Sequence, residues 1–189
     1  MAVKIPIGRS NRHAHLTQEI IEKLFGEGHE LTFLRNIRQH DEFVARETID
    51  VRGPKGLLEG VRLLGPARGV AQVELSLSDA RSIGLRLYAR LSGDVIGTEG
   101  VRLVGPCGEI MLAEGAIVAL RHIHVSPVEA EKLGLVHGQV VSAQAGGVRS
   151  IVFCNIVIRV DPLFTFELHL DTDEFNAAGL KKGDFAELL

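Results

Sequence analysis

The chain has 189 residues, a formal net charge of −3 at pH 7 and 46% hydrophobic residues, enough to build the core of one domain or of two small ones. The acidic balance argues against a general nucleic-acid binder, because counterion release requires a strongly basic surface. No apolar run approaches the roughly 20 residues of a membrane helix, and Cys107 and Cys154 are too few for a disulfide framework. We therefore predict a soluble, cytoplasmic protein without a nucleic-acid or membrane partner.

Many short strands, Gly-rich turns and a few short helices follow one another along the chain. The predicted strands are residues 3–7, 31–37, 42–45, 48–51, 60–64, 86–91, 100–104, 109–112, 116–120, 140–143, 150–160 and 164–168. The predicted helices are residues 18–25, 79–85, 128–133 and 174–180. This pattern favours a mainly β protein with short α-helices rather than a sheet with helical crossovers. We expect two small β-barrels capped by helices, without a disordered linker.

One strand sequence occurs twice. Residues 60–66 (GVRLLGP) return forty positions later as residues 100–106 (GVRLVGP). Each copy reads as a strand that Gly-Pro ends, and the repeat indicates duplicated β units. A tight turn is predicted at residues 53–56 (GPKG), which lacks the spacing of a phosphate-binding P-loop.

Two Arg-His-x-His blocks stand out, at residues 12–17 (RHAHLT) and 121–126 (RHIHVS). On a strand, side chains alternate between faces, so each histidine pair lies on one face with about 7 Å between its members along the backbone. The final Thr or Ser reads as a helix N-cap, and Gly26 and Gly134 read as C-caps. The arrangement is suited to binding a metal.

Two weaker copies have the same order of residue types. Residues 74–78 (ELSLS) and 169–173 (HLDTD) each precede a predicted helix. The alignment places Glu74 and Ser76 in the slots of one histidine pair, and His169 and Asp171 in the slots of another. We therefore predict four strand-to-helix corners of one design.

Five of the eight histidines and one glutamate occupy these corners, and zinc binds both residue types. The candidate ligands are His13, His15, Glu74, His122, His124 and His169. A single His-x-His pair is more often solvated, but the repeated context favours metal. Six ligands suit two sites of three, and three protein ligands leave positions open for catalysis. The spacing leaves open which ligand joins which site. His29, His40 and His137 lie outside the pattern and are interpreted as surface or core histidines.

Three arginines lie near the corners: Arg12, Arg68 and Arg121. Arg68 is in the tight turn of residues 65–69 (GPARG), six residues before Glu74. A guanidinium held by such a turn beside a divalent cation would bind phosphate through two parallel hydrogen bonds. The alternative is a solvated turn arginine. Ser126 is better explained as a helix cap than as a nucleophile, and no histidine is near Cys107 in the sequence.

From about residue 3 to its end, the sequence closely resembles the PduL family of phosphotransacylases, also called phosphate propanoyltransferases. The resemblance is carried, in order, by residues 10–16 (SNRHAHL), 53–56 (GPKG), 61–68 (VRLLGPAR), 72–76 (QVELS), 121–124 (RHIH) and 169–174 (HLDTDE). It implies two β-barrel domains with the active site, a dinuclear zinc centre, between them. One domain would comprise residues 1–11 and 120–189, and the other residues 12–119.

The resemblance also implies the pairing of the ligands. One zinc would be held by His13, His15 and Glu74, with the coenzyme A sulfur able to take the open position. The second zinc would be held by His122, His124 and His169, with water or phosphate completing its shell. Arg68 matches the phosphate-positioning arginine of the family, which makes it the catalytic and substrate-binding residue.

The implied reaction converts a short-chain acyl-CoA, propanoyl-CoA or acetyl-CoA, and phosphate into acyl phosphate and coenzyme A, and the reverse. Phosphate would attack directly, without an acyl-enzyme. The alternative enzyme is a dinuclear zinc hydrolase of thioesters or phosphoesters, and a metal-binding scaffold without turnover is a further alternative. Whether the chain forms a homo-oligomer stays open.

Family members that act inside bacterial microcompartments, as in propanediol utilisation, usually carry an amphipathic N-terminal extension that targets them to the shell. Here the matching part begins at residue 3. Either such a segment has been removed, and the full-length form associates with the shell and works in the microcompartment lumen, or the protein is a cytosolic member.

Overall fold

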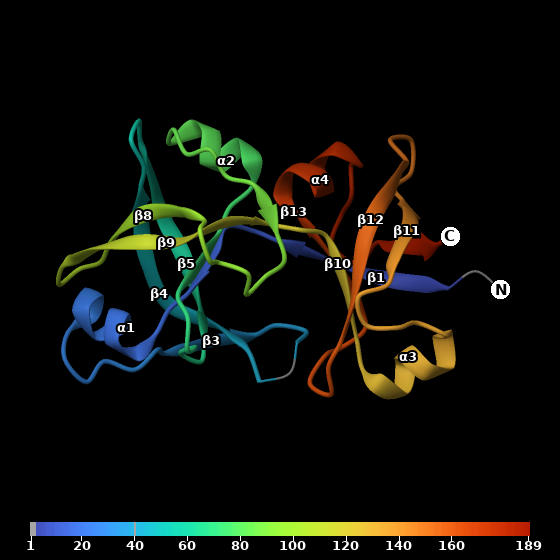
Figure 1. Cartoon of the computed structure of the whole chain (residues 1–189), viewed down its shortest axis with the longest axis horizontal. Coiled ribbons are helices and arrows are strands. Elements are labelled where there is room, and N and C mark those ends of the chain that lie inside the picture. The colour runs from blue at the N-terminus through green and yellow to red at the C-terminus, as the bar shows by residue number, and fades with distance from the viewer. Residues whose placement is uncertain (1–2, 40) are drawn as a thin grey trace. The chain divides into compact units, whose positions relative to one another are not determined.

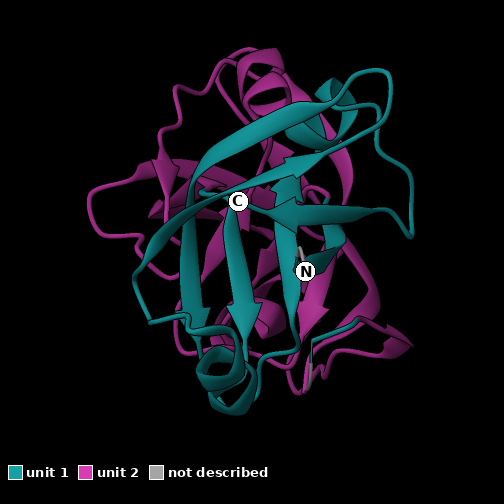
Figure 2. Cartoon of the chain, turned by 90° about the vertical axis from the view of Figure 1, so that its right-hand side faces the viewer, with its two compact units in different colours: residues 1–10, 38–40, 120–189 teal, residues 11–37, 41–119 magenta. Residues whose placement is uncertain are grey.

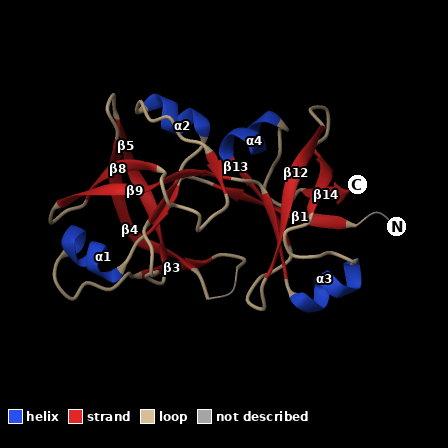
Figure 3. Cartoon of the chain, viewed as in Figure 1, coloured by secondary structure: helices blue, strands red, loops and turns tan. Residues whose placement is uncertain are grey.

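The computed structural model describes residues 3–39 and 41–189. Over these residues the chain is mainly β with four short helices, as predicted (Figure 3). It divides into two compact units, which Figure 2 colours separately: unit 1 contains residues 1–10, 38–40 and 120–189, and unit 2 contains residues 11–37 and 41–119. These units differ from the domain bounds expected from the sequence at residue 11 and at residues 38–40.

Unit 2 contains a closed six-stranded barrel with two helices. Its elements are β2 (His13–His15), α1 (Gln18–Phe25), β3 (Phe33–Asn36), β4 (Phe43–Arg52), β5 (Leu57–Gly65), β6 (Gln72–Glu74), α2 (Leu77–Ser82), β7 (Ala89–Arg90), β8 (Glu99–Val104) and β9 (Glu109–Ala119) (Figure 1). The ring runs β4, β5, β2, β6, β9, β8 and back to β4. β3 pairs with β4, and β7 with β9. The core holds fully buried aliphatic residues such as Leu16, Ile21, Leu24, Leu63 and Leu103.

Unit 1 contains a second closed barrel. Its elements are β1 (Lys4–Ser10), β10 (His122–Val125), α3 (Pro127–Leu133), β11 (Val140–Ala145), β12 (Ile151–Val160), β13 (Glu167–Asp171), α4 (Thr172–Ala177) and β14 (Phe185–Leu188). The ring runs β11, β12, β10, β13, β1, β14. Its core includes Ile5, Ile123, Ile156, Ile158 and Leu168. The two predicted barrels are thus confirmed. No helix among the described residues is long and apolar enough to cross a membrane.

The two barrels have the same topology. The parallel pairs β2–β5 and β6–β9 of unit 2 correspond to the parallel pairs β10–β12 and β13–β1 of unit 1. β1 therefore takes the place in its ring that β9 takes in the other. Since β1 precedes β2 in the chain as β9 precedes β10, the chain consists of two similar halves. The first strand of each half completes the barrel that the rest of the other half builds.

Several predicted strands differ from the observed ones. Residues 42–45 and 48–51 belong to a single strand, β4, whose irregular pairing with β5 accommodates the interruption. Residues 109–112 and 116–120 likewise fall on one strand, β9, up to Ala119. Residues 86–91 shorten to the two-residue β7, because Leu85 and Leu87 face the core without a ladder partner. Residues 164–166 precede β13, since a turn bonds Phe164 N to Asp161 O at 3.0 Å.

The repeated Gly-Val-Arg-Leu segments are not copies of one structural position. They form β5 and β8, which pair with β4 in the same barrel. The duplication that the topology shows is instead between the two halves of the chain, where the strand-to-helix corners recur.

In unit 2, two Gly-Pro-x-Gly turns donate hydrogen bonds to backbone carbonyls at the C-terminal ends of helices. In the turn between β4 and β5, Lys55 N donates to Ile83 O at the end of α2, at 2.9 Å; in the turn between β8 and β9, Cys107 N donates to Leu24 O of α1, also at 2.9 Å. A Cβ on Gly53 would lie 2.4 Å from Ile83 O. Only glycine therefore allows the turn to approach the helix end closely enough to satisfy its last carbonyls.

Replacement of Gly53 by alanine is expected to lower the free energy of unfolding by about 1–3 kcal/mol, because the added methyl group must push the turn away from a backbone oxygen. Urea unfolding followed by circular dichroism measures the change. Gly69→Ala is the matched control, since a Cβ there meets no atom within 4 Å. Equal stability of the two variants would contradict the assigned role of Gly53.

Candidate metal centre

All six predicted ligands lie in strand-to-helix corners, and the four corners are confirmed as β2–α1, β6–α2, β10–α3 and β13–α4. In the two His-x-His corners the N-caps are the predicted hydroxyl residues: Thr17 Oγ1 accepts from Ile20 N, and Ser126 Oγ from Glu129 N, both at 3.3 Å. Gly26 and Gly134 are the C-caps, as predicted.

The two weaker corners differ from the predicted alignment. Their helices begin two residues early, so Ser76 and Asp171 are the N-caps; Ser76 Oγ accepts from the third helical N–H at 3.1 Å, and Asp171 Oδ1 at 2.8 Å. The slot aligned with the second histidine is therefore used for capping. A His-x-His corner supplies two ligands and a weaker corner supplies one.

Pairing of neighbouring strands assembles these ligands into two groups of three. β2 runs antiparallel to β6 with His13 opposite Glu74, and β10 runs antiparallel to β13 with His122 opposite His169. We call His13, His15 and Glu74 the unit 2 triad, and His122, His124 and His169 the unit 1 triad. In each triad, one ligand atom from each residue lies within 4.8 Å of the other two. This distance suits three ligands around one ion.

In the unit 2 triad, hydrogen bonds select the atoms that face the centre. His13 Nδ1 lies 2.8 Å from Asn11 O; because a carbonyl only accepts, Nδ1 carries the proton and Nε2 keeps its lone pair. That Nε2 is 3.6 Å from Glu74 Oε2. The other carboxylate oxygen, Oε1, accepts from Gln72 Nε2 at 2.6 Å and Ser92 Oγ at 2.9 Å. Oε2 is thereby directed toward the histidines.

His15 gives the clearest indication that the unit 2 triad is suited to a metal ion. Its side chain is 3% exposed, and its Nδ1 has no hydrogen-bond partner within the described chain. Burial, and then the charges of His13 and Arg68, hold the pKa of His15 well below its usual value, so the ring is neutral at neutral pH. A buried nitrogen without a partner destabilises a protein by about 1–3 kcal/mol, and a metal ion would remove that penalty. The donor set, two imidazole nitrogens and a carboxylate, fits zinc.

The unit 1 triad repeats this arrangement. His122 Nδ1 lies 2.7 Å from Leu120 O, the equivalent of the His13 bond, which leaves Nε2 as its ligand atom. The three rings have centroids 4.5–4.9 Å apart, and the His124 ring stacks on Phe164 at 3.7 Å. His169 Nε2 lies 3.1 Å from Glu167 Oε2. Burial raises the pKa of Glu167, but the hydrogen bond and charge of His169, with Gln39 and Arg38, outweigh it and hold the pKa below its usual value.

The arginines that precede the two histidine blocks have structural partners. Arg12 Nη1 is 3.2 Å from Asp79 Oδ1, and Arg121 Nε is 2.6 Å from Glu174 Oε1. Both carboxylates belong to the third residue of a short helix, α2 and α4 respectively. The two arginines therefore join each His-x-His strand to the helix of the neighbouring corner.

Arg68 is placed beside the unit 2 triad. Its backbone N donates to Leu16 O at 2.9 Å, which fixes its turn next to the residue that follows His15. The guanidinium charge reaches His15 strongly enough to contribute to the lowered pKa of that ring. Its Nη2 forms an ion pair with Glu42, and the Arg68 side chain keeps 36% of its surface exposed. An exposed guanidinium at a cluster of metal ligands can bind an anion.

The other sequence candidates are accounted for elsewhere. The Cys107 thiol donates to Phe25 O at 3.2 Å, and Cys154 is exposed. His29 Nε2 is 3.1 Å from Glu47 Oε1, and His137 Nδ1 accepts from Val160 N at 3.1 Å. His40 lies outside the described residues. Neither described histidine of this set joins a triad.

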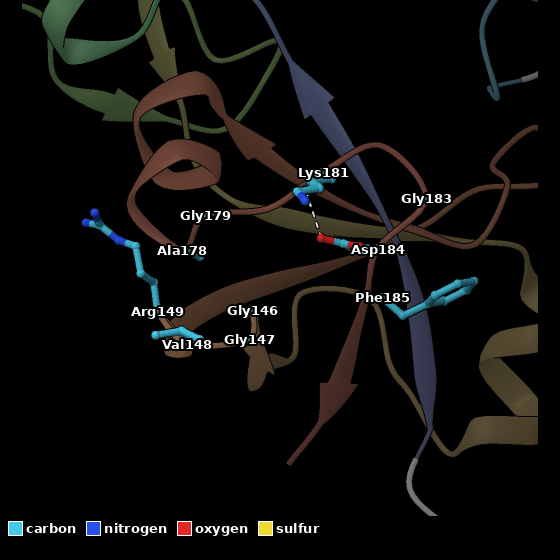
Figure 4. Close-up of a pocket in the computed structure, with 10 residues that line it drawn as sticks. All are labelled: Gly146, Gly147, Val148, Arg149, Ala178, Gly179, Lys181, Gly183, Asp184 and Phe185. Atoms are coloured by element: carbon cyan, nitrogen blue, oxygen red, sulfur yellow. Dashed lines mark hydrogen bonds between the residues drawn. The ribbon is translucent and has the colours of Figure 1, made fainter.

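A surface hollow of about 620 Å³ lies in unit 1, away from these residues in the sequence. It is lined by Gly146, Gly147, Val148, Arg149, Ala178, Gly179, Lys181, Gly183, Asp184 and Phe185. Figure 4 shows Arg149 extending away from the turn in which Lys181 N donates to Asp184 Oδ2 at 2.8 Å. The lining residues include none of the six ligands. The hollow is therefore not the predicted site.

Sequence reasoning missed the polar residues that hold the ligands. Gln72 and Glu167 each stand two residues before the single ligand of a weaker corner and contact it. Strand alternation places positions i and i+2 on one face, so extending the pattern backward by one step would have identified both. Ser92 and Gln39 come from distant loops, and the sequence pattern offered no indication of them.

Comparison with known proteins identifies the family of the chain. A family model described as phosphate propanoyltransferase matches residues 6–181. A phosphate propanoyltransferase of Salmonella typhimurium is 48% identical over 176 residues, covering 93% of this chain and 83% of the relative. One from Thermotoga maritima is 45% identical, covering 98% and 89%, and one from Listeria monocytogenes is 40% identical, covering 95% and 84%.

Proposed function

Because the chain belongs to the phosphate propanoyltransferase family, we propose that it interconverts propanoyl-CoA or acetyl-CoA and phosphate with acyl phosphate and coenzyme A, using two zinc ions. One ion would bind the unit 2 triad and the other the unit 1 triad. The observation that supports zinc is the buried, neutral His15, whose Nδ1 lacks a protein partner within the described chain. Each triad supplies three ligands and so leaves a position for a substrate atom.

Hydrogen bonds orient two ligand side chains of the unit 2 triad before any cation binds. The His13 Nδ1–H is fixed by Asn11 O, and Glu74 Oε1 by Gln72 and Ser92. Bound zinc would supply Lewis acidity, which stabilises a thiolate leaving group and negative charge on a carbonyl oxygen. Preorganised ligands avoid the reorganisation that would otherwise oppose binding.

Arg68 would hold phosphate for attack. A phosphate oxygen forms a bond to the thioester carbonyl carbon, the carbon–sulfur bond breaks, and coenzyme A leaves as the thiolate. The guanidinium can donate two parallel hydrogen bonds to the phosphate and thereby orient it. It is exposed enough to do so, and its present partner, Glu42, is a carboxylate that a phosphate could replace.

We further propose that no acyl-enzyme forms. The hydroxyls two residues from a ligand in sequence, those of Thr17, Ser76 and Ser126, accept hydrogen bonds from helix N–H groups as caps. Neither cysteine lies within the two triads. Phosphate itself is therefore the nucleophile in this proposal. Two free cysteines also suit a reducing, cytoplasmic location, which we include in the proposal.

The test is to incubate the zinc-loaded protein with propanoyl-CoA, with and without phosphate, and to follow thiol release and acyl phosphate. We expect release that depends on phosphate and yields one acyl phosphate per thiol. Thiol release that ignores phosphate would indicate a hydrolase, and absence of release would indicate a binding protein. Either result would overturn the proposed reaction.

A further inference from the structure

We propose that Glu167 is a positioning residue of the unit 1 triad, where its carboxylate accepts the Nε2–H of His169 and so leaves the Nδ1 lone pair of that ring for a metal ion. The proposal rests on zinc binding, which is part of the proposed function. It concerns a residue that has no ligand role of its own among the triads.

The contact between the two side chains is short and buried. Glu167 and His169 lie two residues apart on β13, and strand alternation puts both side chains on one face. Glu167 Oε2 is 3.1 Å from His169 Nε2, and the Glu167 side chain is 10% exposed. In such a setting an imidazole that donates from Nε2 can bind a metal only through Nδ1. His13 and His122 use the opposite tautomer, since both donate from Nδ1 to a backbone carbonyl.

Gln39 fixes the role of the Glu167 carboxylate as acceptor. Its amide orientation is set by Thr165, whose N donates to Gln39 Oε1 at 3.1 Å and whose O accepts from Gln39 Nε2 at 3.3 Å. The amide NH₂ group therefore faces Glu167 Oε2, also at 3.3 Å, and it lies 3.3 Å from His169 Nε2. Both nitrogens lie within hydrogen-bond distance of Oε2, which accepts from both. Arg38 Nε is 3.9 Å from the other oxygen, Oε1. With donors on both of its oxygens, the carboxylate is the hydrogen-bond acceptor in its contact with His169.

Gly8 makes the room for this carboxylate. Gly8 on β1 is the register partner of His169 on β13. A Cβ on Gly8 would lie 2.7 Å from Glu167 Cδ and 2.9 Å from Oε2. The obstructed atoms are the mobile end of a side chain, so a methyl group at Gly8 would displace the carboxylate at small cost to the backbone. Replacement of Gly8 thus moves the carboxylate without removing it.

The barrel of unit 2 contains an equivalent pair, Gln72 and Glu74, in which the ligand accepts the hydrogen bond and its partner donates it. Gln72 occupies the place before Glu74 that Glu167 occupies before His169, and it lies opposite His15 as Glu167 lies opposite His124. Where the ligand is a carboxylate, the partner is an amide donor at 2.6 Å. Where the ligand is an imidazole, the partner is a carboxylate acceptor. Each partner is chemically matched to its ligand, which is expected of groups that orient metal ligands.

The experiment measures zinc affinity with substrates absent. The zinc dissociation constant is determined by competition with a chromophoric chelator in a His15→Ala background, which leaves the unit 1 triad as the complete one. We expect Glu167→Gln to weaken zinc binding by about 10–100-fold, as loss of such partners does in other metal sites. Gly8→Ala should weaken it in the same direction, although Glu167 is retained.

Glu47→Gln is the matched control. Glu47 also pairs with a histidine at 3.1 Å, and its side chain is 8% exposed, but that histidine, His29, belongs to neither triad. We expect zinc affinity to be unchanged in this variant. Circular dichroism of each metal-free variant shows whether the fold is retained.

The positioning role would be overturned if Glu167→Gln and Gly8→Ala both kept the zinc affinity of the His15→Ala protein. It would also be overturned if the His15→Ala protein itself bound no zinc at the unit 1 triad. The outcome is separable from that of the proposed reaction. Wild-type protein that binds zinc but shows no phosphate-dependent thiol release contradicts the reaction, while the zinc affinities of the variants in the His15→Ala background still decide the role of Glu167.

Discussion

Replacement of His15 by alanine is expected to remove one of two bound zinc ions and to lower phosphate-dependent release of coenzyme A by about a thousandfold or more. Loss of a Lewis acid removes several kcal/mol of transition-state stabilisation, and each 1.36 kcal/mol is tenfold in rate. Zinc per chain is measured by elemental analysis after gel filtration, and the rate by thiol release. His137→Ala is the control, because His137 is exposed and contacts the backbone of Val160 rather than a ligand.

The same substitution should have little effect on the metal-free fold. In the absence of metal, His15 Nδ1 is buried without a partner among the described residues, a penalty of about 1–3 kcal/mol that alanine removes. The cavity left by the ring acts in the opposite direction with about 2–3 kcal/mol. The two free energies of unfolding in excess chelator should therefore agree within about 1–2 kcal/mol. A variant that keeps two zinc ions, or that does not fold in chelator, would show that His15 serves the core instead.

The sequence predicted the ligand types because the His-x-His pattern is local. Two histidines at i and i+2 require only an extended strand to share a face, and β2 and β10 are such strands. The corner design was also predictable, since Thr17 and Ser126 are residue types that cap helices. Both features depend on fewer than ten neighbouring residues.

The pairing of ligands could not be deduced from the spacing, because it is set by strand register. His13 lies opposite Glu74 across sixty residues of chain, in a ladder that involves β2 and β6 only. The start of a short helix was equally ambiguous, since Ser76 and Ser78 are both acceptable caps, and α2 uses the earlier one. The choice of Ser76 removes that residue from the ligand slot and leaves the weaker corner with one ligand.

Replacement of Arg68 by alanine is expected to lower kcat/KM for phosphate by about 10²–10³-fold, mainly through a higher KM for phosphate. This corresponds to about 2.7–4 kcal/mol of lost phosphate binding, since each 1.36 kcal/mol is a factor of ten. Arg68→Lys should recover only part of the loss, since an ammonium group cannot donate in the paired geometry of a guanidinium. Steady-state rates at varied phosphate, with saturating propanoyl-CoA, measure both effects. Arg102→Ala is the control, because Arg102 is also an exposed arginine in an ion pair, with Glu109.

The change in the KM for phosphate on replacing Glu42 distinguishes a phosphate-binding role of Arg68 from a structural role. In the absence of substrate the guanidinium is paired with Glu42, so phosphate must compete with that carboxylate for it. Glu42→Gln removes the competing charge and should lower the KM for phosphate, in the direction opposite to Arg68→Ala. If Arg68 served only to hold Glu42, both substitutions would break the same ion pair and would change the KM in the same direction. Opposite changes would therefore assign the guanidinium to phosphate, and parallel changes would assign it to the fold.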